Sequence, residues 1–196
     1  LTLKLSFLRD KISKENYDMK ISSLLELPKL IENTLKIERD IQEASKDFSE
    51  AKGSMFLGRG YSFPIALEGA LKLKELAYVH AEGYPAGEMK HGPLALIENG
   101  MPVVVIAPRD EFYSKTISNM QEVISRGGKV LLISNKSTDE VSSENLWKKI
   151  QVETISDDLF PFLVTIPLQL LAYYAANALG YDIDKPRNLA KSVTVE

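Results

Sequence analysis

Apolar residues in the first fifty positions recur at three- and four-residue intervals among lysine, glutamate and aspartate. Leu24, Leu27, Ile31 and Leu35 show the pattern, which is the spacing of one face of an α-helix. We therefore expect residues 1–50 to form a helical arm. The chain opens at Leu1 inside this periodic stretch rather than at a methionine, so we also expect that it was trimmed from a longer protein.

Beyond Gly53, short apolar runs alternate with longer helical segments. We expect strands at 54–57, 102–107, 129–134 and 150–154, helices at 62–80, 111–126 and 159–179, and a loop at 81–93. Strands made of continuous Val, Ile and Leu are typical of a parallel sheet covered on both faces. The expected fold class is α/β, a three-layer sandwich over residues 51–180 with helices on both faces of a parallel sheet.

The C-terminal part of the chain departs from this regular alternation. We expect Pro161 and Pro167 to break the last helix, because an internal proline removes a backbone hydrogen bond and clashes with the preceding turn. Residues 181–196 hold Pro186 and charged residues without a period. They predict an extended tail that either frays or closes over the domain.

Composition narrows the choice of partners. The chain mixes 24 basic with 27 acidic residues and has a formal net charge of -3, which leaves no basic face for nucleic acid. It has no cysteine and two histidines, which excludes disulfides, thiolate zinc sites and a His-rich metal site. No apolar run approaches the roughly 20 residues that cross a bilayer, and the signal-peptide pattern is missing. We expect a soluble, cytoplasmic protein without membrane contact.

The first candidate site is the turn Gly58-Arg59-Gly60, between a buried strand and a helix N-terminus. Backbone N–H groups and the helix dipole favour an anion at such a place. A dinucleotide fingerprint requires glycine or alanine at the position of Phe63, which argues against a nucleotide, and we expect no cofactor. Either the glycines only permit a tight turn, or Arg59 and Ser62 hold a small ligand at the carboxyl end of the strand.

The helix that follows carries three charged residues at helical spacing. Glu68, Lys72 and Glu75 are spaced by four and three, which puts them on one helical face. On an arbitrary helix such a stripe is solvated and held by ion pairs. Because this helix starts at the glycine turn, its first turns are also expected to line a ligand cleft, and both interpretations stay open on the residues alone.

A loop histidine and a C-terminal lysine complete the candidates. His91 stands between a lysine and a Gly-Pro turn, and histidine is the side chain suited to passing a proton to a sugar oxygen near neutral pH. His80, by contrast, is expected to cap or pack the helix end. Lys191 is near the C-terminus, where a lysine is usually solvated. A Schiff-base role demands an uncharged amine, and hence burial or a cationic neighbour.

Four segments together closely resemble the isomerase region of the glutamine–fructose-6-phosphate aminotransferase family. They are residues 58–60, 68–75, 87–95 and 186–196, and the last is the most specific because family members end in that tail. The resemblance covers essentially the whole chain. It implies two sugar isomerase (SIS) subdomains, each a small parallel α/β sandwich, and this chain looks like the second. Residues 1–50 would then be the end of the first subdomain and the connecting helices, and residues 181–196 would be a catalytic tail.

The resemblance also implies roles in making glucosamine 6-phosphate from fructose 6-phosphate and ammonia released from glutamine. Lys191 matches the lysine that forms a Schiff base with C2 of the open-chain sugar, and Glu75 matches the base that moves a proton between C1 and C2. Lys72 matches a lysine that assists proton movement at the sugar hydroxyls. His91 matches the histidine that opens the ring from the neighbouring subunit, which implies a homodimer. The residues that the resemblance suggests for substrate binding are Gly58, Arg59, Ser62, Glu68 and Ala190.

The chain departs from the family in what it lacks. It has no cysteine, so it does not contain the glutaminase half, and the phosphate-binding loop of the first SIS subdomain is also missing. We therefore expect the fragment to fold and dimerise yet to show little or no activity. Two alternatives stay open. One is a SIS module that senses sugar phosphates in a regulator, and the other is a sugar-phosphate isomerase or deglycase that works without ammonia.

Overall fold

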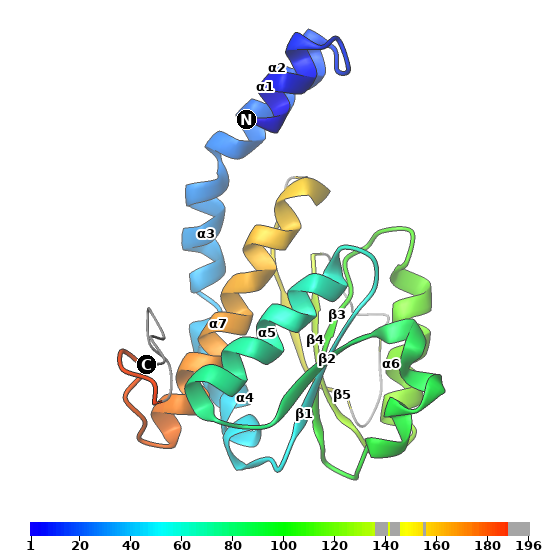
Figure 1. The fold of residues 1–196 in the computed structure, drawn as a ribbon, viewed down its shortest axis with the longest axis vertical. Helices are drawn as coiled ribbons and strands as arrows, with labels where there is room; N and C mark the ends of the chain where they lie inside the picture. Colours follow the sequence, from blue (N-terminus) through cyan, green and yellow to red (C-terminus); the bar gives the residue numbers. More distant parts are fainter. Residues whose placement is uncertain (136–140, 142–145, 155, 188–196) are drawn as a thin grey trace, which may run out of the picture.

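A computed structural model describes residues 1–135, 141, 146–154 and 156–187, and its central feature is a five-stranded parallel sheet (Figure 1). The strands lie in the order β2-β1-β3-β4-β5. Their bounds are β1 Ser54–Gly58, β2 Ala81–Pro85, β3 Pro102–Ile106, β4 Lys129–Ser134 and β5 Leu146–Gln151. The prediction of an α/β fold with a parallel sheet is confirmed. Ala190 and Lys191 lie outside the described residues.

Alternate side chains of the strands point to opposite faces of the sheet. Phe56 and Val104 are buried in one core, whereas their neighbours Met55 and Val103 are buried in a second core on the other face. The first face is covered by α4 (Glu38–Glu50), α5 (Ser62–Ala77) and α7 (Phe160–Ala178). The second face is covered by α6 (Tyr113–Ile124) and the 3-10 helices η1 (Ala86–His91) and η2 (Pro93–Leu96). This arrangement is the predicted three-layer sandwich.

Helices precede the sheet, as the N-terminal pattern predicts. The first three extend away from the sheet (Figure 1) and are α1 (Thr2–Leu8), α2 (Lys14–Leu25) and α3 (Leu27–Leu35). Helices α1 and α2 bury none of their residues. Helix α3 contacts α7 and buries Leu30 and Thr34, and the fourth helix, α4, packs along α7 and buries Ile41, Ala44 and Phe48 completely. The last helix of the predicted arm therefore contributes to the core of the sheet domain.

Two strands differ from the prediction. The segment predicted as a loop at 81–93 begins with strand β2, which pairs with β1 along its whole length. Gly83 and Pro85 are poor strand formers, which an edge strand tolerates. Glycine is required at position 83, since a Cβ there would lie 2.9 Å from the backbone of Leu67. Strand β5 lies at 146–151 rather than 150–154, because its partly exposed residues do not form a continuous apolar run.

Helix α7 is continuous, so the predicted break at its prolines is wrong. Pro161 lies in the first turn, where a missing N–H costs nothing, and Pro167 is buried inside the helix. Burial of residues such as Leu163 and Val164 outweighs the roughly 3 kcal/mol cost of an internal proline. Among the described residues, Asp157–Ala178 is long and apolar enough to cross a membrane. The expectation that no apolar run approaches the length needed to cross a bilayer is therefore wrong. The most apolar window of the helix is 56% buried, because the helix packs as the core helix of the domain.

Candidate functional site

The turn Gly58-Arg59-Gly60 lies at the carboxyl end of β1. On one side of β1 the sheet continues with β2, and on the other side with β3. Open α/β sheets bind ligands at the carboxyl ends of strands beside such a point. A Cβ on Gly58 would lie 2.3 Å from the carbonyl oxygen of Ser62, and Gly60 has a φ of +52° beside the ring of Phe112. The turn itself therefore requires both glycines.

Arg59 ties this turn to the helices on the second face. Its Nη1 donates a hydrogen bond of 3.0 Å to Oδ1 of Asn119 in α6. The guanidinium group also packs over Gly87 in η1, where a Cβ would lie 2.7 Å from Nη1. Ser62 is buried in the first turn of α5. In this structure Arg59 stabilises the loops around the turn, and its contact with a ligand stays a prediction.

The three charged residues of α5 lie together as their spacing predicts. Nζ of Lys72 is 2.5 Å from Oε2 of Glu75 and 3.8 Å from Oε1 of Glu68. The side chains of Lys72 and Glu75 are only 29% and 26% exposed. The hydrogen bond to Glu75 raises the pKa of Lys72 above its ordinary value, although partial burial opposes the shift. Lys72 is therefore a protonated donor held beside a carboxylate.

Glu75 lies at the far end of α5 from the glycine turn. Between Ser62 and Glu75 the helix advances thirteen residues, which is about 20 Å at 1.5 Å per residue. Glu68 lies between them, in a shallow groove that α5 forms with the start of α7. Within one copy of the chain, the glycine turn and the Lys72–Glu75 pair are two separate groups.

The two histidines lie apart from the Lys72–Glu75 pair. His91 is exposed at the end of η1, on the sheet face opposite α5. His80 does not cap α5 as expected, because the C-cap residue is Tyr78. The His80 carbonyl accepts a 2.9 Å hydrogen bond from the backbone N–H of Ser54, and its ring lies 3.3 Å from a Glu82 carboxylate oxygen. One copy of the chain therefore offers Glu75 no histidine from η1.

The beginning of the C-terminal tail docks at the end of α5. The backbone N–H of Arg187 donates a 2.7 Å hydrogen bond to the hydroxyl of Tyr78, and the Arg187 guanidinium lies 4.0 Å from the centre of the Tyr78 ring. The ring of Tyr181 is 4.8 Å from that of Tyr78. These residues were not predicted as a group from the sequence. The signals available were an aromatic residue just after a helix and an arginine in the tail.

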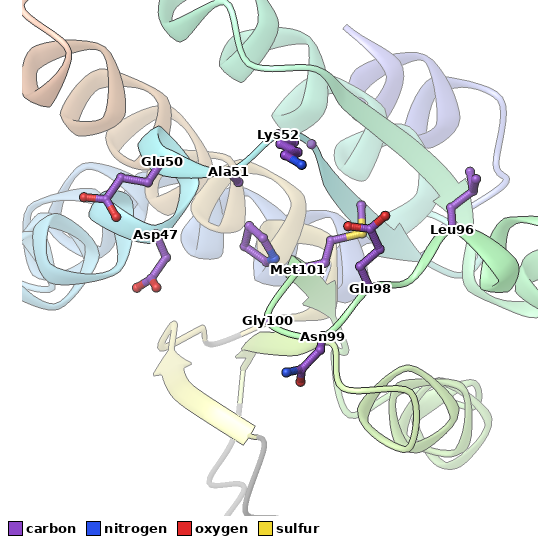
Figure 2. A pocket seen from close by; sticks show the side chains of 11 residues that line it. Asp47, Glu50, Ala51, Lys52, Leu96, Glu98, Asn99, Gly100 and Met101 are labelled. Carbon is purple, nitrogen blue, oxygen red and sulfur yellow. The ribbon is translucent and has the colours of Figure 1, made fainter.

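A hollow at the amino-terminal ends of the strands, opposite the glycine turn, contains none of the predicted site residues (Figure 2). It lies where β1 and β3 begin, between the end of α4 and the loop that leads into β3. Its charged lining residues are Asp47, Glu50, Lys52 and Glu98. Within the part of the chain that the structure describes, no group of three or more histidines, aspartates and glutamates could hold a metal ion.

The sheet order and the two helical layers define a parallel α/β sandwich domain of the kind that carries sugar isomerase sites. The chain belongs to the SIS domain family, whose model matches residues 47–179. Within this family the resemblance noted from the sequence is confirmed. The chain is 47% identical over 188 residues to the glutamine–fructose-6-phosphate aminotransferase (isomerizing) of Bartonella quintana (strain Toulouse), which covers 96% of this chain and 31% of the relative.

Two solved structures have the same fold. The C-terminal domain of glucosamine-fructose-6-phosphate aminotransferase from Francisella tularensis superposes with a TM-score of 0.89 at 42% identity, covering 94% of this chain and 52% of that one. Glucosamine-6-phosphate deaminase from Thermotoga maritima superposes with a TM-score of 0.67 at 28% identity, covering 98% and 55%. The chain therefore spans about a third of the length of the curated relatives and about half of these two structures.

Proposed function

We propose that this chain is the C-terminal sugar-phosphate-handling part of an enzyme that makes glucosamine 6-phosphate from fructose 6-phosphate and glutamine-derived ammonia. The observation that carries the proposal is the Lys72–Glu75 pair at the end of α5, next to the start of the tail, in a chain 47% identical to a named aminotransferase. Residues 1–50 connect to a first SIS subdomain, 51–180 form the second, and 181–196 form the catalytic tail. The enzyme is soluble, and its compartment is the cytoplasm.

The reaction uses the amine of Lys191 first and the carboxylate of Glu75 second. The Lys191 amine adds to the C2 carbonyl of open-chain fructose 6-phosphate with loss of one water, and exchange of the lysine for ammonia leaves the fructosimine. Glu75 then takes a proton from C1 and returns it to C2, while the proton of the C1 hydroxyl passes to the imine nitrogen, which gives the aldehyde at C1 and the amine at C2. Lys72 holds Glu75 in place and assists proton movement at the sugar hydroxyls as a charged hydrogen-bond donor, because its raised pKa keeps it protonated. Gly58, Arg59, Ser62, Glu68 and Ala190 stay the substrate-binding candidates.

The active unit is a homodimer in which His91 of one copy serves the other. Ring opening needs an acid–base group at the sugar. What supports a second copy is the position of His91, exposed on the face opposite the helix that carries Glu75. A second copy can present its own η1 to this helix without refolding either chain.

The isolated chain is expected to fold and dimerise but to turn over at least about 100-fold more slowly than the full-length enzyme. Without the rest of the isomerase region, the sugar phosphate loses the groups that orient it, and misplaced reactants cost such factors. Ammonia and fructose 6-phosphate replace glutamine as substrates in the assay, and light scattering gives the mass. Full-rate synthesis by the isolated chain would contradict this expectation.

Borohydride trapping of the full-length enzyme with fructose 6-phosphate tests the proposal directly. We expect a reduced adduct on Lys191 by peptide mass mapping. Lys185→Ala serves as the matched tail control and keeps the adduct, whereas Lys191→Ala abolishes it. An active enzyme without an adduct on Lys191 would favour an isomerase that works through an enediol, and sugar binding without turnover would favour a regulator.

A second function is favoured by one observation, the likeness to a structure described as glucosamine-6-phosphate deaminase. Such an enzyme runs related chemistry toward ammonia release. The two functions are distinguished by incubating the full-length protein with glucosamine 6-phosphate and with fructose 6-phosphate plus glutamine. Faster release of ammonia than formation of amino sugar would identify the deaminase.

A further inference from the structure

Tyr78 ends α5 in a backbone conformation that tyrosine rarely adopts. Its φ and ψ are 57° and 21°, in the left-handed region. Among the described residues other than glycine, only Asp10 and Tyr78 have a positive φ. This C-cap position favours glycine or asparagine, because a Cβ is strained there. The side chain of Tyr78 therefore has contacts elsewhere that keep it in place.

Those contacts all connect α5 to the beginning of the tail. The hydroxyl of Tyr78 accepts a 2.7 Å hydrogen bond from the backbone of Arg187. The Arg187 guanidinium lies 4.0 Å from the centre of the Tyr78 ring, and the centre of the Tyr181 ring lies 4.8 Å from it. Aromatic and cation–π contacts of this kind are favourable even at a partly exposed site.

We propose that Tyr78, Arg187 and Tyr181 form a tail anchor that positions Lys191 against Glu75. The inference rests on the proposed function, because it takes Lys191 as the imine-forming residue. Arg187 precedes Lys191 by four residues, so the Lys191 Cα stays within about 14 Å of the Arg187 Cα. Glu75 precedes Tyr78 by three residues, or about 4.5 Å along the helix. Fixing Arg187 on Tyr78 thus holds the lysine in reach of the carboxylate.

The size of the effect follows from the length of chain that the anchor immobilises. With the anchor in place, four residues separate the fixed Arg187 from Lys191. If the anchor is lost, the last fixed point becomes Ile183, which packs against the core, or Ala178 at the end of α7, so the free segment has eight or thirteen residues. Effective concentration falls with about the −3/2 power of length, which predicts a loss of about threefold to sixfold.

The test uses the full-length enzyme with three substitutions in the anchor. Tyr78→Gly removes the side chain but suits the left-handed backbone, so it separates anchoring from folding. Tyr78→Phe removes only the hydrogen-bond acceptor, and Arg187→Lys keeps the charge but loses the planar group that stacks. Tyr173→Phe and Arg126→Ala, at exposed positions outside the anchor, are the matched controls.

We expect Tyr78→Gly to lower both kcat and the rate of borohydride trapping on Lys191 by about threefold to sixfold. The KM for fructose 6-phosphate should change less than twofold, and Tyr78→Phe and Arg187→Lys should lie between this variant and the unmodified enzyme. The controls keep full activity. A folded Tyr78→Gly variant with unchanged kcat and trapping would overturn the anchor alone, as would a rise in KM without a fall in kcat. If the active unmodified enzyme gives no Lys191 adduct, the proposed function itself fails.

Discussion

Replacing Glu75 by glutamine in the full-length enzyme is expected to lower kcat by about 10²- to 10⁴-fold, which is the usual contribution of a positioned proton-transfer group. Glutamine keeps the size of the side chain but cannot accept the proton from C1. Imine formation precedes that step, so borohydride should still trap fructose 6-phosphate on Lys191. Loss of turnover together with a preserved adduct would locate the defect in the transfer of the proton from C1 to C2.

A control variant and a pKa measurement show whether the loss of activity is specific to Glu75. Glu98→Gln is the matched control and should leave kcat unchanged. Glu98 is exposed and lines the hollow at the amino-terminal ends of the strands. The substitution should also lower the pKa of Lys72 toward its ordinary value, since the hydrogen bond to Glu75 is the main cause of the increase. In the unmodified protein the charge on Lys72, and with it the ion pair, is lost only as the pH rises through this raised pKa, so the pair is intact at neutral pH. Near-normal turnover by Glu75→Gln would refute the proposed base.

The fold was predictable from sequence where strands are buried on both faces. β1, β3 and β4 read as continuous apolar runs because helices cover both sides of them. β5 lies at the sheet edge and carries Lys148, whose Nζ is 2.8 Å from Glu43 and 3.1 Å from Asp40 in α4. A strand stabilised by ion pairs to a distant helix has no local apolar signature. That is why its position was predicted about four residues late.

The candidate site was predictable where helix periodicity alone decides it. Lys72 and Glu75 had to share a face of α5 because they are three residues apart. No comparable rule links Tyr78 with Arg187, since their contact depends on how the chain returns after α7. No spacing rule places His91 either. Its position on the face opposite α5 depends on where the chain goes after β2, which is the edge strand beside β1. Local spacing predicts neighbours on one element, whereas contacts between elements need the topology.

Mixing two inactive variants of the full-length enzyme should restore about a quarter of the normal activity. One variant carries His91→Ala and the other Lys191→Ala, and neither homodimer has an intact site. If His91 serves the opposite subunit, a mixed dimer combines the lysine of the first variant with the histidine of the second in one of its two sites. Random exchange makes half of the dimers mixed, so a quarter of all sites are intact.

The same experiment excludes a site built within one subunit. If His91 acted beside Lys191 of its own chain, every site in a mixed dimer would still lack one of the two groups, and activity would stay at the level of the separate variants. The control pairs His91→Ala with Glu98→Gln, which leaves half of all sites intact in either arrangement and so shows that mixing alone does not change activity, while native mass spectrometry of the mixture measures the exchange of subunits. The sheet lies between η1 and α5 in each copy, and this separation is the physical reason to expect the restored quarter.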